Sequence, residues 1–485
     1  MIDESGNSMR YINKVDLLII ARNMSLLMIG IGLLCLVPIV VDLIFLEFNA
    51  ISYLIPALIS IFLGVIFAKA FGKYGDKRVR LKHTMMISSL SWLWACIVCA
   101  SILYLVTGTG IIDCAFECMS ALTGSGITIY ADVEALPYSI LFFRAFQQWI
   151  GGLGVVLIII SFVAKPGSAS HKLYVSEARE DRIKPSTKAT LKNTIIIYFI
   201  YTALGIALYI LAGMPIFDAV CNTFSIISTG GMSIKNANIG FYQNDIIYFI
   251  TMVLMVLGAT SFLAHFYIIK TRGRSLIHDS QFQVMICLIA VTSMLIYFAS
   301  NILPMDVLFT VVSAITTTGA SIESSTVMGA WPSFVIFIIM MLMLIGGSTG
   351  STVGAIKLNR VISFSRGIYR NLRQIISPRG AVIPNPKSKG KLDDKVATQS
   401  GNYITLYCLC IIFTWAAFCL YCHDPFNSLF FSMSMQGNIG LEIGQLSQTM
   451  EWPLKIIGMF NMWSGRLEIY PLLITFRAFF EIFKR

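Results

Sequence analysis

Apolar segments of about 20 residues alternate with short polar segments along nearly the whole chain. Two such segments come first, and four longer apolar regions, each with room for two more, follow them. The segments and regions lie at about residues 24–46 and 51–70, then 84–163, 193–270, 281–363 and 402–483. A helix needs about 20 residues to cross a hydrocarbon core of about 30 Å. The pattern therefore predicts an all-α polytopic membrane protein that begins with an extra N-terminal helix pair.

A second, shorter pattern occurs once in each of the four longer regions. It is an amphipathic stretch that ends in a glycine-containing turn, as in residues 306–320. In every copy an Asp or Asn lies 13 residues before the glycine, and a Ser lies six residues before it. The four sets are Asp113, Ser120 and Gly126; Asp218, Ser225 and Gly231; Asp306, Ser313 and Gly319; and Asn427, Ser434 and Gly440. These offsets predict a short helix whose N-cap or first turn carries the polar residue.

The fourfold repeat predicts the architecture. Each copy lies between two membrane-length segments, so the repeated unit is membrane helix, short pore helix, filter turn and membrane helix. Four tandem units in one chain can close around a pseudo-fourfold pore. The predicted divisions are an N-terminal transmembrane helix pair (1–83), pore repeat 1 with a cytoplasmic loop (84–192), pore repeat 2 (193–280), pore repeat 3 (281–363), a cytoplasmic linker (364–401) and pore repeat 4 (402–485). The linker either only joins two repeats or also offers a docking surface to a cytosolic partner.

Composition and charge support a membrane location. Hydrophobic residues make up 56% of the chain and charged residues 13%, and this balance excludes a soluble protein of 485 residues. The net charge of +11 does not indicate a nucleic-acid partner, because the basic residues lie between apolar segments. With the N-terminus in the cytoplasm, the inner segments hold nearly all Lys and Arg, and the outer loops contain only Lys235. We therefore expect a multi-pass cell (inner) membrane protein in contact with lipid, with both termini cytoplasmic.

The four glycine turns are candidate cation ligands. Irregular backbone at membrane depth is tolerated only inside protein or along a wet cavity, so four equivalent turns imply one shared cavity. Their carbonyl oxygens can replace the hydration shell of a monovalent cation. The predicted potassium ligands are Thr123, Gly124, Ser125, Gly126, Ser228, Thr229, Gly230, Gly231, Thr316, Thr317, Thr318, Gly319, Asn438, Ile439 and Gly440. Only one acid, Glu442, lies beside a turn, and the absence of a ring of acids favours K⁺ over Ca²⁺. The alternative interpretation is that the four turns are helix-breaking loops of an ordinary transporter.

Residues 344–357 interrupt the predicted second membrane helix of repeat 3. Each internal glycine costs a helix about 1 kcal/mol relative to alanine. The run of Gly346, Gly347, Ser348, Gly350 and Gly354 therefore predicts a break below the filter. We interpret the break as a gate, and the alternative is close helix packing through small residues. A gate role predicts that deletion of residues 346–354 raises basal ion flux.

Two arginines fall within predicted second membrane helices. Arg466 lies about halfway along the last apolar segment, where a charge costs at least about 2.5 kcal/mol. It is therefore predicted to face the pore as part of the gate, or to pair with an acid between helices. Glu468 would lie on the opposite face of a continuous helix. Arg144, near the outer start of its helix, is expected to snorkel or to anchor the filter.

In combination, these motifs resemble the TrkH/KtrB/HKT superfamily of potassium transporters, and the N-terminal helix pair makes the TrkH family the closer match. The resemblance rests on the four turns, Arg144 with residues 147–152, and the segments 346–352 and 465–469. It implies K⁺ uptake, a homodimer of pseudo-fourfold pores, a gating loop at 346–354 and a basic pore residue at Arg466. It also implies a cytosolic TrkA-type nucleotide-binding subunit that controls opening.

The sequence departs from the family pattern at two turns. The first turn reads Thr123-Gly124-Ser125-Gly126, where the family often has Thr-Thr-Thr-Gly. The fourth turn is preceded by Gln436-Gly437-Asn438. All four filter glycines are present, which within the family favours K⁺ over Na⁺.

Two other classes of function compete with this interpretation. An ion-coupled secondary transporter, using Na⁺ or H⁺ symport with K⁺ or another solute, usually shows inverted repeats, whereas these units share one orientation. A membrane enzyme lacks support because the five His are scattered and no nucleophile motif occurs. The chain is therefore predicted not to be an enzyme and to need no organic cofactor.

Overall fold

The computed structural model describes residues 12–75, 77, 79–154, 187–271, 279–378, 394–421, 423–444 and 446–483. Within these ranges the secondary structure is helical and contains no strand, which confirms the predicted all-α class. Six of the described helices are long and apolar enough to cross a membrane, and four shorter apolar helices accompany them. Residues 379–393 of the predicted linker at 364–401 lie outside the described residues, whereas its two described ends are mainly helical.

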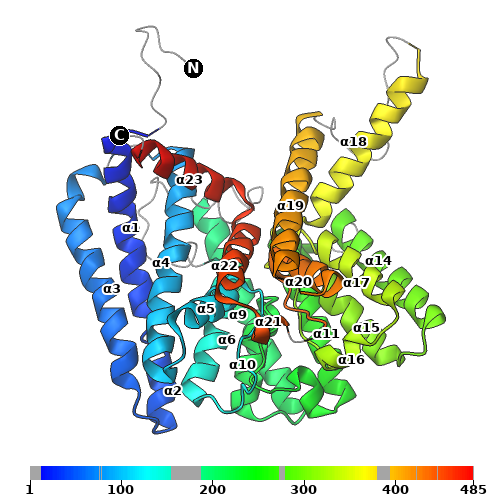
Figure 1. The fold of residues 1–485 in the computed structure, drawn as a ribbon, viewed down its shortest axis with the longest axis horizontal. Helices are drawn as coiled ribbons and strands as arrows, with labels where there is room; N and C mark the ends of the chain where they lie inside the picture. The colour runs from blue at the N-terminus through cyan, green and yellow to red at the C-terminus, as the bar shows by residue number, and fades with distance from the viewer. Residues whose placement is uncertain are drawn as a thin grey trace.

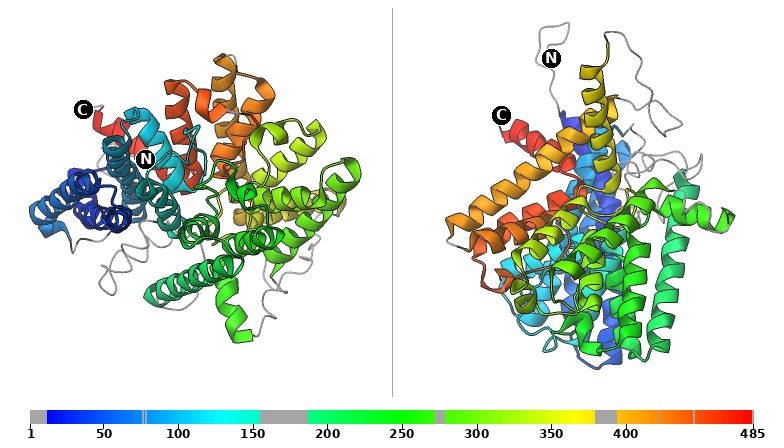
Figure 2. Two further views of the ribbon diagram at one scale, coloured as in Figure 1. Left: turned by 90° about the horizontal axis from the view of Figure 1, so that it is seen from below. Right: turned by 90° about the vertical axis from the view of Figure 1, so that its right-hand side faces the viewer.

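A pair of long helices, α1 (Lys14–Leu34) and α3 (Ala50–Ala70), precedes the repeats and lies on one side of the molecule, drawn in blue in Figures 1 and 2. The short α2 (Pro38–Ile44) connects them. Gly32 and Gly64 let the two helices approach closely, because a Cβ at either position would come within 2.7 Å of a backbone oxygen of the other helix. The helix pair is thus held by small residues, and α1 begins earlier than the predicted start near residue 24.

The four predicted repeat regions contain the remaining helices. Repeat 1 has α4 (Leu81–Thr107), α5 (Ile111–Thr123) and α6 (Tyr138–Leu153). Repeat 2 has α9 (Thr187–Leu211), α10 (Ile216–Ile227), α11 (Asp245–Ala259) and α12 (Phe262–Thr271). Repeat 3 has α14 (Ser280–Ala299), α15 (Pro304–Ile315), α16 (Ser325–Gly329), α17 (Ser333–Ile345) and α18 (Leu358–Ile376). Repeat 4 has α19 (Asp394–Leu420), α20 (Pro425–Gly437), α21 (Leu446–Thr449), α22 (Trp452–Leu467) and α23 (Tyr470–Phe483). Elsewhere in the chain, two 3₁₀ segments lie between helices, at Gly72–Tyr74 and Asn238–Tyr242.

The short pore helices and the second helices pack in a closed cyclic order. The second helix of each repeat packs against its own pore helix and against the pore helix of the next repeat. The pairs between repeats are α6 with α10, α11 with α15, α17 with α20, and α22 with α5. The last repeat therefore returns to the first, and Figure 2 (left) shows the cyan, green, yellow-green and orange-to-red segments around a common centre.

The second helices are shorter than the sequence predicted. We expected spans of about 20 residues in every repeat except the third. In the structure α6, α11, α17 and α22 have 16, 15, 13 and 16 residues, and they end before Gly154, Thr260, Gly346 and Glu468. The last three resume after a break as α12, α18 and α23. The expectation was wrong because apolar composition does not show where a helix ends, and these breaks lie where other repeats supply hydrogen-bond partners.

Candidate functional site

Each pore helix carries, near its start, the polar residue that the sequence pattern singled out. That residue is the third of the helix in every copy, so it lies in the first turn and not at the N-cap. The four residues are Asp113 in α5, Asp218 in α10, Asp306 in α15 and Asn427 in α20. The carboxylates among them interact favourably with the positive end of the helix dipole. The opposite, partially negative ends of the four helices lead into the glycine turns.

The four turns share one pattern of backbone hydrogen bonds. In each turn the amide of the residue before the filter glycine donates to the carbonyl of the serine found by the sequence pattern, over 2.9 to 3.0 Å. These donor and acceptor pairs are Ser125 and Ser120, Gly230 and Ser225, Thr318 and Ser313, and Ile439 and Ser434. Such a bond is typical of a helix C-terminus that ends in a left-handed residue. The same backbone hydrogen bond in all four turns thus explains why the spacing between the serine and the glycine repeats.

Left-handed backbone occurs twice in every turn. The filter glycines Gly126, Gly231, Gly319 and Gly440 have φ values between 73° and 99°. The residue two positions earlier also has a positive φ, between 52° and 74°, and is Gly124, Thr229, Thr317 or Asn438. A β-branched residue rarely adopts this conformation, so contacts around the two threonines must stabilise it.

The four turns form a closed ring. A Cβ added at each filter glycine would overlap the backbone carbonyl oxygen of the residue before the filter glycine in the next repeat. The pairs are Gly126 with Gly230, Gly231 with Thr318, Gly319 with Ile439, and Gly440 with Ser125. Only glycine fits at these four positions, because backbone oxygens cannot move aside as a flexible side chain can. The structure therefore brings together all four turns of the sequence pattern, in the order of the repeats.

The hydroxyl groups of the four serines do not all support their turns in the same way. Ser120 and Ser313 each donate, over 2.6 Å, to the carbonyl of the residue after the filter glycine. Ser434 instead accepts from the amide of Gly440 at 3.0 Å. The Ser225 hydroxyl is buried without a hydrogen-bond partner. The backbone of the four turns is thus equivalent, whereas the side-chain support differs between repeats.

A buried ion pair supports the first two turns, and its acid was missed in the sequence. Arg144 of α6 is buried and pairs with Glu117 of α5 at 2.8 Å, so its side chain does not snorkel. Glu117 also accepts from the amide of Ile129, just after the first turn, at 3.0 Å. Arg144 donates to the carbonyl of Ser233, just after the second turn, at 3.2 Å. The signal for Glu117 was an acid inside an otherwise apolar pore helix.

Residues 346–357, here called the inner loop, lie against the inner side of the turns. The amide of Gly354 donates to the Thr317 hydroxyl at 3.2 Å, and the amide of Ala355 donates to the carbonyl of Gly437 at 3.1 Å. The Thr352 hydroxyl lies 3.0 Å from that of Thr229. The loop therefore contacts turn residues of repeats 2 and 3 and the end of the pore helix of repeat 4.

The inner loop also bonds to the break after α11. The amide of Ser348 donates to the carbonyl of Ala259 at 3.0 Å, and the amide of Phe262 donates to the carbonyl of Gly350 at 3.0 Å. Gly346 and Gly350 have φ values of 71° and 74°, which a helix cannot contain. The predicted break at Gly346, Gly347, Ser348, Gly350 and Gly354 is present, and it forms a buried loop rather than a close helix–helix contact.

Arg466 lies in the last turn of α22, because the helix ends at Leu467 and not beyond it as predicted. Its buried guanidinium donates to the carbonyl of Thr352 at 2.6 Å. It also donates to the carbonyls of Gly151 and Gly152 at the end of α6. Arg466 thus connects the inner loop to repeat 1, and the structure brings together all the residues that the sequence assigned to the gate.

Glu468 belongs to a second ion-pair group that sequence reasoning missed. The expectation that it lies on the helix face opposite Arg466 was wrong, because the helix has ended and Glu468 has a φ of 62°. Its carboxylate lies 3.3 Å from the Lys357 ammonium and 2.5 Å from the Arg360 guanidinium. Lys357 is the last residue of the inner loop and is fully buried. The C-terminal end of the loop is therefore tied to the break after α22.

The loops that follow the first two turns are also joined to each other. The Asn236 side chain donates to Asp132 at 2.8 Å and accepts from the amide of Val133 at 2.8 Å. The hydrogen bond from Asn236 lowers the pKa of the exposed Asp132 carboxyl from its ordinary value. This contact is at the surface, so we expect its contribution to stability to be small.

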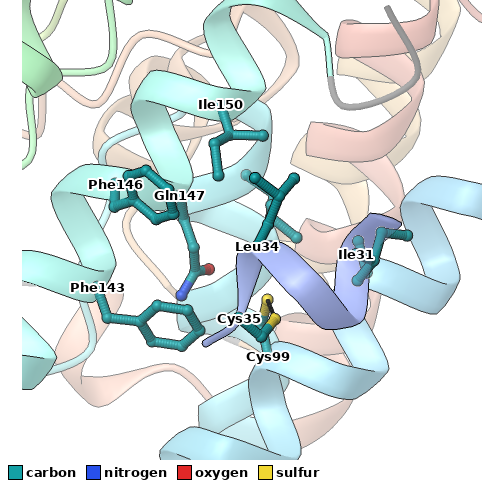
Figure 3. A pocket seen from close by; sticks show the side chains of 10 residues that line it. Ile31, Leu34, Cys35, Cys99, Phe143, Phe146, Gln147 and Ile150 are labelled. Carbon is teal, nitrogen blue, oxygen red and sulfur yellow. Dashed lines mark hydrogen bonds between the residues drawn. The ribbon is translucent and has the colours of Figure 1, made fainter. Parts of the chain in front are cut away.

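A separate apolar hollow lies between the N-terminal helices and repeat 1 (Figure 3). It is lined by Cys35, which follows α1, and by residues of α1, α4, α5 and α6, among them Cys99 and Phe146. Gln147 points into it, and its side-chain oxygen is buried without a hydrogen-bond partner. Gln147 is thus one of the α6 residues that line the hollow, whereas the adjacent Gln148 lies outside it and binds the second turn.

No three His, Cys, Asp or Glu side chains converge on a possible metal site within the ranges that the structure describes. The turn residues themselves offer backbone carbonyls and side-chain hydroxyl or amide oxygens. These are hard oxygen ligands, suited to an alkali cation.

The chain is similar to known cation transporters over nearly its full length. The family model TrkH, described as a cation transport protein, matches residues 59–302 and 305–482. An uncharacterized cation transporter of Methanocaldococcus jannaschii is 36% identical over 454 residues, which cover 93% of each chain. The Trk system potassium uptake protein TrkH of Halomonas elongata is 26% identical and covers 96% of this chain and 99% of its own length.

The fold is similar to that of a solved transporter. The crystal structure of the potassium transporter TrkH from Vibrio parahaemolyticus superposes with a TM-score of 0.81 at 24% identity, covering 94% of this chain and 98% of that one. The predicted family resemblance is confirmed, and the chain is a polytopic membrane protein whose relatives are transporters. The chain belongs to the TrkH family of cation transport proteins.

Proposed function

We propose that this chain mediates potassium uptake across the cell membrane through a pore in which four turns bind dehydrated K⁺. The observation that carries the proposal is the closed ring, in which each filter glycine lies against a carbonyl of the next repeat. Four equivalent backbone segments can thereby offer carbonyl oxygens to one ion. The partially negative C-terminal ends of the four pore helices add attraction for a cation. The ligands would be the 15 turn residues named from the sequence.

In this proposal the inner loop and Arg466 form a gate below the filter. The loop contacts turn residues Thr229 and Thr317, so it lies on the path of an ion that leaves the ring inward. The charge of Arg466 would repel a cation there, because a buried charge is weakly screened. Opening would require the loop to leave its contacts with Arg466 and with the breaks after α11 and α22.

We further propose that the gate is controlled from the cytoplasm. The relatives named as TrkH are described as parts of a Trk potassium uptake system, which favours a regulatory subunit and, by family resemblance, a homodimer. The start of α1, the end of α23 and the projecting ends of α18 and α19 lie on one side of the molecule in Figure 1. We assign this side to the cytoplasm because of the asymmetry of Lys and Arg in the sequence.

The test is uptake of radioactive rubidium by proteoliposomes that contain the purified protein and K⁺ inside. External K⁺ should compete with rubidium at lower concentration than external Na⁺ does. A variant without residues 346–354 serves as the open form, so that a closed wild-type gate cannot conceal the activity. No rubidium flux in either protein would refute the proposal. Flux that requires an imposed Na⁺ or H⁺ gradient would instead indicate a coupled transporter.

A further inference from the structure

Gln148 of α6 contacts the second turn with both ends of its side-chain amide. Its NH₂ group donates to the carbonyl of Gly230 at 2.7 Å, and its oxygen accepts from the amide of Met232 at 3.2 Å. The side chain is fully buried, and it lies so close that a Cβ at Gly230 would come 2.5 Å from it. Gln148 therefore holds the backbone on both sides of Gly231.

The carbonyl that Gln148 holds belongs to the ring. The oxygen of Gly230 is the one that a Cβ at Gly126 would overlap, so it lies at the contact between the first and second turns. A carbonyl oxygen has two lone pairs, and one of them here accepts from Gln148. The bond fixes where this oxygen points and leaves the other lone pair for a different partner.

Arg144 extends the same support by one helical turn. Residues 144 and 148 are four apart on α6, so their side chains lie on one face of the helix. Arg144 donates to the carbonyl of Ser233, and its partner Glu117 accepts from the amide of Ile129. The buried Glu117–Arg144 pair is therefore fixed to both the first and second turns, and Gln148 acts on the oxygen nearest the contact between them.

We propose that Gln148 is a positioning residue that sets the cation selectivity of the ring. Arg144 and Glu117 support it by holding the backbone that follows the second and the first turn, respectively. The inference deepens the proposed function and rests on it. Discrimination between K⁺ and Na⁺ depends on the spacing and number of coordinating oxygens. Release of the Gly230 oxygen lets the second turn contract around a smaller ion, so selectivity falls while the pore still conducts.

The test compares Gln148→Met with Gln147→Met in proteoliposomes. Met has a similar volume to Gln and cannot donate or accept strong hydrogen bonds, so each change removes polar contacts with little change in packing. Gln147 is the matched control because it is the adjacent glutamine of the same helix but points into the apolar hollow (Figure 3). Both variants carry the deletion of residues 346–354, so that gating does not affect the comparison.

The measured quantities are the maximal rubidium flux and the concentrations of K⁺ and of Na⁺ that halve it. We expect Gln148→Met to reduce the preference for K⁺ over Na⁺ by about fivefold, the effect of one hydrogen bond of ordinary strength, with maximal flux changed less than twofold. Gln147→Met should leave the preference unchanged. Equal preference in the Gln148 variant and the control, at normal melting temperature, would overturn the inference.

The outcomes separate the two proposals. If the deletion protein itself carries no rubidium, the proposed function fails and selectivity cannot be measured. If it conducts and prefers K⁺, but Gln148→Met keeps that preference, only the role of Gln148 fails. If Gln148→Met does not fold, the variant Arg144→Lys takes its place. It retains the positive charge beside Glu117 but changes the reach to Ser233, so it should lower the preference for K⁺ over Na⁺. An unchanged preference in Arg144→Lys also overturns the inference.

Discussion

The ring of turns and the inner loop lie against each other but are built in opposite ways. The ring consists of four copies of one backbone motif, each closed by a hydrogen bond between residues five apart in the sequence. The inner loop occurs once and is held by residues from other repeats, such as Ala259 and Arg466, and by Gln281 of α14. The backbone of each turn is thus determined locally and repeats four times, whereas the loop depends on distant partners and has no equivalent in the other repeats.

The difference suits the two proposed tasks. A filter must keep its oxygens at fixed positions, and local backbone hydrogen bonds together with glycines packed against carbonyls leave little freedom. A gate must have two arrangements of similar free energy, which requires contacts that can be exchanged. The polar contacts of the loop to Thr229, Thr317 and Arg466 can be replaced by water or ions when the loop moves. We therefore expect changes in the ring to abolish transport and changes around the loop to increase it.

The largest effect should come from Gly319→Ala in the ring. The added methyl would overlap the carbonyl of Ile439, and alanine would also be strained at a φ of 74°. Overpacking and backbone strain together cost about 3 kcal/mol, so we expect rubidium flux to fall at least about 100-fold. Gly329→Ala is the control, because the nearest atom to its Cβ is 3.7 Å away. Normal flux in Gly319→Ala would show that the ring is not the ion path.

Deletion of residues 346–354 should have the opposite effect. The ends of the loop are close together, since the amide of Lys357 donates to the carbonyl of Ile345 at 2.9 Å, so the chain can be rejoined. Removal of a closed gate should raise basal rubidium flux by about 30-fold or more, as expected for a loop held by several buried hydrogen bonds of about 1 kcal/mol each. A folded deletion protein without flux would contradict the gate.

Arg466→Ala tests the same gate through one side chain. The change removes the hydrogen bonds to Thr352, Gly151 and Gly152 and a buried positive charge. We expect flux without any partner protein to rise about tenfold, since a charged hydrogen bond contributes about 1.5 to 3 kcal/mol. Lys455→Ala, on the same helix but paired with Asp113 at its other end, is the control. Unchanged or lower flux would remove Arg466 from the gate.

Glu468→Gln should produce a smaller increase in flux. It weakens the pairs with Lys357 and Arg360 that tie the end of the loop to α22, but leaves Arg466 in place. Glu468 is partly exposed, so we expect only about a threefold rise. Glu451→Gln, which weakens an exposed pair with His423, should leave flux at the wild-type level. A rise in both variants would point to a general loss of stability.

The smallest effect concerns the outer contact between repeats 1 and 2. The pKa of Asp132 is lowered by the hydrogen bond from Asn236, so the folded protein favours the ionised form. Its contribution to stability is present above the ordinary Asp pKa of 3.8 and is lost as pH falls through the lowered value. Asp132→Asn should slightly flatten the fall of melting temperature below pH 4 and leave flux unchanged. A change of flux would place this contact in the ion path.

Much of the ring was predictable because its causes lie close together in the chain. The spacing of Asp306, Ser313 and Gly319 reflects one short helix and its C-terminal turn, and the same spacing recurs in the other copies. Local backbone geometry leaves a trace in the sequence, since only certain residues fit a first helical turn or a left-handed turn. Glu117 and Gln148 were missed because their partners in the first two turns are set by the packing of α5 and α6.

The all-α membrane class, the fourfold pattern and the position of the glycine-rich loop could all be read from the sequence. The sequence could not show the cyclic order in which the turns meet, the end of α6, the breaks after α11 and α22, or the partners of Arg466 and Glu468. Those features depend on contacts between residues far apart in the chain, and an isolated apolar segment carries no record of its neighbours. Only the tertiary structure decides which carbonyls a buried arginine reaches, because burying its charge without partners would cost too much free energy.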